Sequence, residues 1–232
     1  EGVILKICKG NKFIDQADVN DEVEIITNQT PFYAESGGQI GDQGVIKTSN
    51  CNIKIIDTQK KMGDLHVHIG KVEKGSIKIK ENVYLEIDEK KRNDARAYHS
   101  ATHLLHEALR RTLGKHVTQK GSLVSPAKLR FDFSYNKPIE KDEITKIEKM
   151  VNEMVASSSE VKTRIMTTKK AVEKGALAMF GEKYGDEVRV LSMGKENGSY
   201  FSTELCGGTH VTNTKDIGKF KIINQSSIAA GV

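Results

Sequence analysis

The sequence contains few cysteines: Cys8, Cys51 and Cys206 are the only three in 232 residues. Their number is odd and they lie far apart, so they do not form the set of pairs on which a disulfide-stabilised domain depends. We therefore expect a reducing compartment, the cytoplasm. A lone cysteine is more often a small buried apolar residue than a ligand, and we interpret Cys8 and Cys51 in this way.

Long apolar runs are also absent. No stretch approaches the roughly 20 apolar residues that a membrane-spanning helix needs, and no signal-peptide pattern is found at the start. We therefore expect no membrane partner. The sequence begins at Glu1 without a methionine and ends at Val232 in mid-pattern, so we expect it to be part of a longer chain.

Arginine is missing from residues 1–88, which carry 11 lysines against 14 acidic side chains. The remaining residues carry 25 basic against 17 acidic side chains, so a first part of net charge −3 precedes a second part of +8. A basic part favours a phosphate-rich partner. The asymmetry is compatible with a nucleic-acid partner but does not identify one.

The first part predicts short strands separated by turns. Many short strands with regular turns are typical of a small barrel or sandwich, and no helical period is found. We predict an N-terminal small β-barrel over residues 1–88. Its strands are expected where apolar residues alternate or run together, at residues 3–7, 22–27, 44–48, 52–58, 65–70, 76–80 and 83–87.

The hydrophobic period becomes helical after Asp88, a suitable N-cap, and remains so up to Gly114. Further elements are expected beyond it: strands at 122–125, 128–135, 187–193, 200–205 and 219–224, a helix opened by Pro138 with apolar positions from Ile144 to Val155, and a short helix within 169–180. Helices and strands mixed without a strict β-α-β order indicate an α+β fold. We predict an α/β two-layer core over residues 89–232.

Two pairs of possible metal ligands occur in this second part. His99 and His103 are four residues apart in the expected helix, so both imidazoles face one side. Cys206 and His210 enclose "GGT", whose glycines allow a tight turn at positive φ. Neutral imidazole and thiolate are ligands that zinc prefers, so the four side chains together make a workable site for one Zn²⁺.

His106 leaves a second possibility open, because it returns to nearly the same helix face as His99. His103 and His106 are then the alternative helical pair. Histidines four apart on a helix also occur without any metal. The residues between His99 and His103 are Ser-Ala-Thr, without the glutamate of the common zinc peptidase motif, which argues against a peptidase.

Five blocks, in order, resemble the editing region of the alanyl-tRNA synthetase family and the free-standing alanyl-tRNA editing proteins: "PFYAESGGQIGDQG", "HSATHLLHEAL", "VTQKGSLV", "RFDFS" and "ELCGGTHV". The resemblance covers nearly the whole chain. Editing domains of threonyl-tRNA synthetase also combine a helical histidine pair with a cysteine–histidine element. They lack the "SGGQ" and "CGGTH" blocks and rank second.

The resemblance implies a β-barrel followed by a zinc-containing editing core. It implies that the zinc ligands are His99, His103, Cys206 and His210, which leaves His106 as an ordinary helix-face residue. It also implies that Gln119 takes part in catalysis together with the metal-bound His99 and His103, and that Gly37 and Gly38 bind the substrate. Gln39 lies next to these glycines, and we expect the three residues to bind the substrate by bringing backbone close to its 3′ adenosine, or else to form a plain tight turn between barrel strands. Thr102 and Thr209 flank ligands, and their hydroxyls are expected either to recognise serine or to cap the local backbone.

The implied reaction is hydrolysis of the ester that joins a wrong amino acid, serine or glycine, to the acceptor end of alanine tRNA. Zinc is expected either to activate a water or to position the substrate, and both roles stay open. The aminoacylating domain and a C-terminal domain would lie outside this sequence, so we do not expect it to activate alanine. No P-loop or dinucleotide glycine signature contradicts this.

Basic residues at the start of the zinc helix are candidates for contact with acceptor-stem phosphates: Lys90, Lys91, Arg92 and Arg96. A solvated charged helix face is the plainer interpretation. Two other classes of function also remain, a zinc-stabilised RNA-binding module without catalysis and a small metallohydrolase acting on a different ester or amide.

Overall fold

The structure is a computed structural model that describes residues 1–177, 185–229, 231 and 232. The chain forms two compact units, Glu1–Arg92 and Asn93–Val232, and each is described by itself. The long helix α1 (Glu89–Leu113) begins in the first unit and continues in the second. The division between the units falls after Arg92. The sequence predicts this boundary slightly earlier, near residue 88. No described helix is long and apolar enough to cross a membrane.

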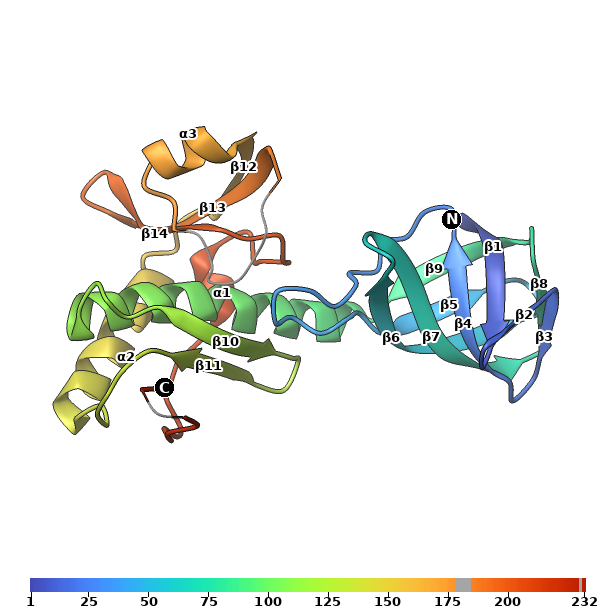
Figure 1. Ribbon diagram of the computed structural model, residues 1–232, viewed down its shortest axis with the longest axis horizontal. Coiled ribbons are helices and arrows are strands. Elements are labelled where there is room, and N and C mark those ends of the chain that lie inside the picture. The colour runs from blue at the N-terminus through green and yellow to red at the C-terminus, as the bar shows by residue number, and fades with distance from the viewer. Residues whose placement is uncertain (178–184, 230) are drawn as a thin grey trace. The chain divides into compact units, whose positions relative to one another are not determined.

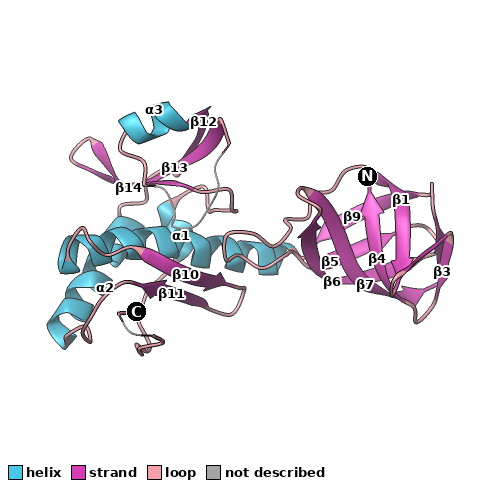
Figure 2. Cartoon of the chain, viewed as in Figure 1, coloured by secondary structure: helices cyan, strands magenta, loops and turns pink. Residues whose placement is uncertain are grey.

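The first unit consists mostly of β-strands, whereas the second mixes helices and strands (Figures 1 and 2). A seven-stranded antiparallel sheet has the order β2-β1-β4-β7-β6-β5-β9, and β9 also pairs with β1. β3 (Gln16–Asp18) and β8 (Ser76–Lys78) form a separate pair. The strands of the large sheet are β1 (Gly2–Lys9), β2 (Lys12–Ile14), β4 (Glu22–Thr27), β5 (Gly44–Lys47), β6 (Asn52–Lys61), β7 (Leu65–Lys74) and β9 (Asn82–Ile87).

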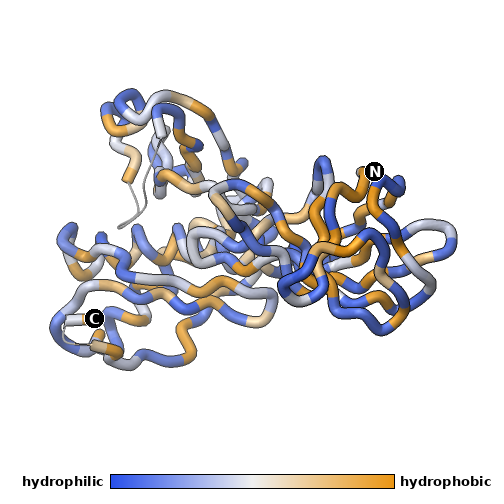
Figure 3. Tube along the Cα trace, turned by 45° about the vertical axis from the view of Figure 1, so that its right-hand side comes forward, coloured by the Kyte–Doolittle hydropathy of each residue, from blue (hydrophilic) through white to orange (hydrophobic). Residues whose placement is uncertain are grey.

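Aliphatic side chains on alternate strand positions form the core of this unit. In β4, Val23 and Ile25 are buried while Glu22 is exposed, which is the period-2 pattern of a strand with one covered face. Figure 3 shows this alternation as orange and blue segments along the strands. All seven strands expected from the sequence are confirmed. β2 and β3, of three residues each, were not expected.

In the second unit, α1 runs beside the hairpin of β10 and β11 and a three-stranded antiparallel sheet of order β12-β13-β14 (Figure 1). Its other elements are β10 (Gln119–Val124), β11 (Leu129–Phe133), α2 (Lys141–Ala156), β12 (Lys162–Thr167), α3 (Thr168–Glu173), β13 (Glu187–Glu196), β14 (Ser199–Leu205) and the 3₁₀ helix η1 (Thr214–Ile217). The structure is thus of mixed α+β class, with strands in the majority.

The core of the second unit joins one face of α1 to α2 and to the sheet. Leu104, Leu105 and Leu109 recur at helical spacing on α1 and are buried against Ile147 and Val151 of α2. Burying a Leu or Ile side chain contributes about 1.5–3 kcal/mol to folding. This packing fixes the rotation of α1 about its axis, and therefore the direction in which its histidines point.

Two expectations for this unit are wrong. Helix α2 begins at Lys141, not at Pro138, because Glu140 is the N-cap and its backbone N–H donates to the Glu143 carboxylate at 2.9 Å. No strand forms at 219–224. There, Asn152 of α2 both donates to the carbonyl of Phe220 and accepts from its N–H. A side chain thus replaces the neighbouring strand as hydrogen-bond partner. The short helix is confirmed as α3, while residues 178–180 of its expected span lie outside the described residues.

A buried ion pair in the first unit joins the start of α1 to the loop that precedes β5. Arg92 is 9% exposed, and its Nε donates to both carboxylate oxygens of Asp42 at 2.9 Å. Its Nη2 donates to the Pro31 carbonyl, also at 2.9 Å. Asp42 in turn accepts from the Tyr33 N–H at 2.7 Å. Removal of one member would leave the other charge buried and unpaired.

We therefore predict that Arg92→Met destabilises the first unit by about 3–5 kcal/mol, the usual cost of breaking a buried pair. The measurement is hydrogen exchange of the first-unit strands. The control is Lys91→Met on the same helix turn, whose ion pair with Asp88 is solvent-exposed and whose loss should cost less than about 1 kcal/mol. Equal effects of the two variants would contradict the prediction.

Candidate metal centre

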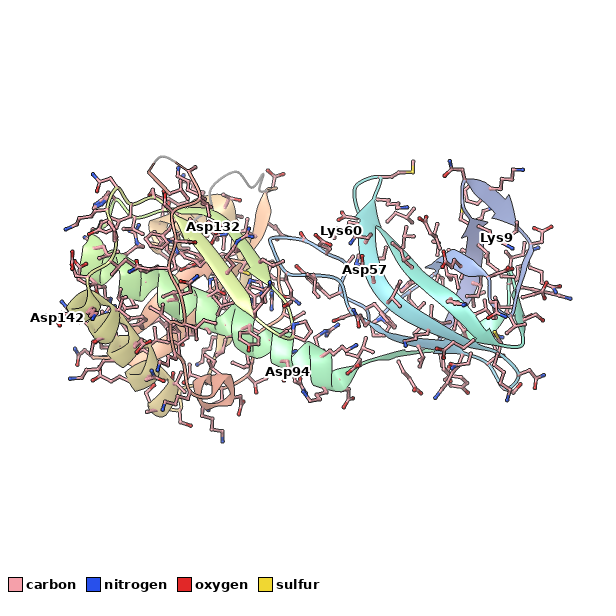
Figure 4. All side chains as sticks on the ribbon, turned by 90° about the horizontal axis from the view of Figure 1, so that it is seen from below. Lys9, Asp57, Lys60, Asp94, Asp132 and Asp142 are labelled. Atoms are coloured by element: carbon pink, nitrogen blue, oxygen red, sulfur yellow. The ribbon has the colours of Figure 1, made fainter. Side chains whose placement is uncertain are left out.

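Four side chains from two distant segments meet in the second unit. The ligand atoms of His99, His103, Cys206 and His210 all lie within 4.8 Å of one another. Two of the residues come from α1 and two from the segment that follows β14. Carboxylates are not part of this group: of those labelled in Figure 4, Asp94 lies on α1, and Asp132 lies on β11, where it accepts from Arg130 at 3.0 Å.

Two of the distances between donors match those around one tetrahedral ion. Sγ of Cys206 is 3.4 Å from Nε2 of His99 and 3.3 Å from Nε2 of His210. Ligands at about 2.0–2.3 Å from a tetrahedral ion lie about 3.3–3.7 Å from each other. Nε2 of His103 is buried and has no hydrogen-bond partner within the described part of the chain. A cation would satisfy that nitrogen, and three imidazoles with one thiolate form a donor set that fits zinc.

The helix and the turn orient the donors by different means. On α1, the rings of His99 and His103 stack with centroids 5.2 Å apart, as expected for a four-residue step. After β14, the Cys206 N–H donates to the Arg189 carbonyl at 3.0 Å, and the Arg189 guanidinium donates to the carbonyls of Cys206 and Gly208. Sγ of Cys206 also accepts from the Gly208 N–H at 3.4 Å. Arg189 on β13 therefore holds the turn.

Gly207 does not have the positive φ that the sequence suggested for this turn, and a Cβ there would meet nothing within 4 Å. The conformation of Gly207 is therefore open to other residues. The hydrogen bonds of Arg189, rather than the freedom of this glycine, shape the turn.

The surroundings of Cys206 and His210 favour the protonation states in which these two side chains bind a metal. Burial alone would raise the pKa of the Cys206 thiol, but the three surrounding histidines outweigh it and lower that pKa well below its usual value. Burial and the nearby charge of His99 lower the pKa of His210 to about 3. A thiolate and a neutral imidazole are the forms in which these side chains bind zinc.

Sequence reasoning missed Glu204, which is 1% exposed and lies directly behind the donors. Its Oε2 is 2.7 Å from Nδ1 of His103, and its Oε1 is 3.1 Å from Nδ1 of His106. Burial acts to raise the pKa of Glu204, yet His103 prevails and lowers it to about 2. Burial acts to lower the pKa of His103, but Glu204 and Cys206 raise it to about 10, so a cation that binds Nε2 of His103 must displace a proton from that nitrogen. Strand alternation was the available signal, because Glu204 stands two residues before Cys206.

Ser100 was also not singled out. Its Oγ lies 3.3 Å from Nδ1 of His210 and accepts from the Val211 N–H at 3.1 Å. A hydroxyl oxygen has two lone pairs, so Ser100 can accept from both groups. It thereby ties the ring of His210 to α1.

The structure does not bring His106 into the group of four. Its Nδ1 faces Glu204, and its ring lies against Phe131 with centroids 5.3 Å apart. Thr102 is buried, and its hydroxyl donates to the Tyr98 carbonyl one helical turn earlier, at 2.9 Å. Thr209 is half-buried beside His210. The local, backbone-capping interpretation therefore suits Thr102.

Gln119 is the first residue of β10. Its Nε2 donates to Ser122 Oγ at 3.3 Å, and its Oε1 is buried without a hydrogen-bond partner among the described residues. In the first unit, Gly37 and Gly38 have φ of 56° and 82°, values that L-residues rarely adopt. Backbone hydrogen bonds between Ser36 and Gln39 close a tight turn around them.

The four basic residues at the start of α1 differ in their surroundings. Lys90 is exposed, Lys91 donates to Gln43 at 2.5 Å, and Arg96 donates to Asn93 at 3.1 Å. Arg92 is buried and paired with Asp42, so its guanidinium is not available to a phosphate. This pairing with a loop of the first unit argues against the expected contact of Arg92 with tRNA, which stays a prediction.

Comparisons with known proteins point to one family. Residues 1–91 match the model described as tRNA synthetases class II (A), and residues 188–232 match the model described as Threonyl and Alanyl tRNA synthetase second additional domain. The whole chain is 51% identical to the alanine–tRNA ligase of Parvibaculum lavamentivorans. It is 53% identical to those of Mesorhizobium japonicum and a Chelativorans species. It covers 26–27% of these proteins, about a quarter of their length.

We predict that the purified chain binds one zinc ion and that Cys206→Ala or His99→Ala reduces the bound metal to near zero, because three ligands remain where four are needed for a closed site. Elemental analysis after dialysis against a weak chelator measures the content. His116→Ala is the control, since this exposed histidine lies outside the group and should leave the content unchanged. Full metal content in both ligand variants would refute the assignment.

Proposed function

The chain belongs over its whole length to the alanyl-tRNA synthetase family, and on that premise we propose that it is the editing region of such an enzyme. The proposed reaction is hydrolysis of the ester that joins serine or glycine to the 3′ ribose of alanine tRNA, in the cytoplasm. The meeting of His99, His103, Cys206 and His210 is the observation that carries the proposal. The "SGGQ" and "CGGTH" blocks favour this family over threonyl-type editing.

A second hydrolytic site is needed for energetic reasons. A site built for alanine cannot exclude the smaller glycine by shape, and the extra hydroxyl of serine changes binding too little. Single-step selection supplies only about 10–200-fold for a methylene-sized difference. Hydrolysis of the wrong product supplies the remaining selectivity.

The residues of the chain have distinct proposed roles. Zinc held by the four donors would supply a fixed positive charge for the amino group or ribose of the substrate, and a full set of four ligands favours this positioning role over water activation. Gln119 presents a buried Oε1 that can accept from the attacking water. Thr209 remains the candidate for recognising the serine hydroxyl. Gly37, Gly38 and Gln39 are proposed to approach the terminal adenosine with their backbone.

We also propose that the large sheet of the first unit closes into a barrel. β9, at one end of the large sheet, pairs with β1 through Gly2 with Val83 and Val3 with Asn82. This pairing supports the closure of the sheet into a small β-barrel over residues 1–88. The zinc-containing editing core would then occupy residues 89–232.

One observation favours a second function. Four protein ligands are typical of structural zinc sites, whereas catalytic sites keep a position open. A zinc-stabilised tRNA-binding module without catalysis is therefore the alternative. It would bind alanine tRNA and leave a mischarged ester intact.

We predict that the chain deacylates seryl- and glycyl-tRNA(Ala) much faster than alanyl-tRNA(Ala), and that His99→Ala or Cys206→Ala lowers the first two rates by at least about 100-fold, the scale of losing a group that positions the substrate. Release of labelled amino acid and zinc content are measured on the same samples. The His116→Ala control should retain wild-type rates. Full activity in a variant shown to be free of zinc would refute the role of the metal, and tRNA binding without hydrolysis would favour the alternative.

We predict that the triple variant Lys90→Glu, Lys91→Glu, Arg96→Glu weakens tRNA binding and lowers the slope of log affinity against log salt, by up to about 0.7–0.9 for each phosphate that the protein no longer neutralises. Fluorescence anisotropy at several salt concentrations measures both quantities. The matched control reverses three exposed lysines of α2, namely Lys141, Lys146 and Lys149. If the two triple variants had the same affinity and slope, the helix start would not contact the tRNA.

A further inference from the structure

A buried carboxylate reaches two histidines of α1 from the neighbouring strand. Glu204 on β14 is 98 and 101 residues away from His106 and His103 in the sequence, yet it contacts Nδ1 of each, at 3.1 and 2.7 Å. All three side chains are buried. Glu204 is not one of the four donors.

The oxygens of Glu204 constrain the two rings chemically. An ionised carboxylate can only accept hydrogen bonds, so each contacting ring nitrogen must carry the proton. Oε2 takes the contact with His103, while Oε1 takes those with His106 and with the Ser202 hydroxyl at 3.2 Å. The proton of each ring therefore lies on Nδ1.

The consequence concerns the opposite nitrogen of each ring. In a neutral imidazole with its proton on Nδ1, Nε2 keeps a lone pair. Nε2 of His103 is buried, lacks a hydrogen-bond partner among the described residues and belongs to the group of four donors. The other ring, that of His106, lies outside the group and is held against Phe131.

We propose that Glu204 is a positioning residue of the metal centre, which fixes His103 in the Nδ1-protonated form with Nε2 facing the cation. His106 and Ser202 hold the second oxygen of Glu204, so that the carboxylate does not turn away from His103. This inference rests on the zinc centre of the proposed function and adds to it residues that do not touch the ion. Carboxylates behind metal-bound histidines act in this way in general.

The decisive variant is Glu204→Gln, which keeps the size of the side chain. An amide offers one acceptor oxygen and one donor nitrogen, so only one of the two histidines keeps its Nδ1–H contact. The other must take its proton on Nε2, which for His103 removes the lone pair that binds the ion. We expect zinc affinity to fall by about 10–100-fold, the usual effect of losing such a partner.

Chelator competition on the full chain measures the affinity, and circular dichroism checks the fold. Glu196→Gln is the matched control, since it makes the same change of a carboxylate to an amide on the neighbouring strand β13, where the carboxylate pairs with Arg111. Its zinc affinity should equal that of the wild type. Ser202→Ala and His106→Ala should each lower the affinity less than Glu204→Gln, because the other residue still holds Oε1.

Nitrogen NMR of the histidine rings measures the tautomer of each ring. If Glu204 only stabilised the fold, its replacement would leave these tautomers unchanged. In the zinc-loaded wild type, His103 should carry its proton on Nδ1, and Glu204→Gln should shift the tautomer of His103 or His106. A wild-type His103 protonated on Nε2 would overturn the inference even if the variant fails to fold. A folded Glu204→Gln with wild-type zinc affinity would overturn this inference alone, whereas a wild type that binds no zinc would also overturn the proposed metal centre.

Discussion

The second unit depends on one constraint: the segment that follows β14 must approach α1 closely enough to bring three imidazoles and a thiol together, three of these four side chains being buried. Buried polar groups are costly unless each finds a partner. Here Cys206 lies 3.3 and 3.4 Å from two of the ring nitrogens, and Nε2 of His103 has no hydrogen-bond partner in the described part of the chain. A cation would bind that nitrogen and the thiolate at once, so metal binding and the packing of this unit are coupled.

The residues behind the donors determine whether the centre is ordered. Arg189 holds the carbonyls of the turn after β14, Ser100 contacts the ring of His210, and Glu204 contacts that of His103. None of these three is a ligand in the proposed centre. Their contacts restrict ring orientation and backbone geometry, which is what distinguishes a preorganised site from four side chains that merely lie close together.

Two basic side chains at the start of α1 lie in opposite surroundings. Arg92 is buried against Asp42 and stabilises a loop of the first unit, whereas Lys90 is exposed to solvent. The sequence cannot separate these roles, because both residues occupy a helix start rich in basic side chains. Only the position of Asp42, 50 residues earlier in the chain, distinguishes them.

The sequence by itself determined what depends on near neighbours: the period-2 strands of the first unit, the helical span of α1, and the four-residue steps that place His99 beside His103 and Cys206 beside His210. These patterns follow from backbone geometry within a few residues. Tertiary structure alone decided that the two ligand pairs meet, that Glu204 stands behind His103, and that residues 219–224 bind Asn152 and Glu148 instead of forming a strand. Each of these contacts joins residues far apart in the chain, and their formation depends on how whole elements pack, which no local period encodes.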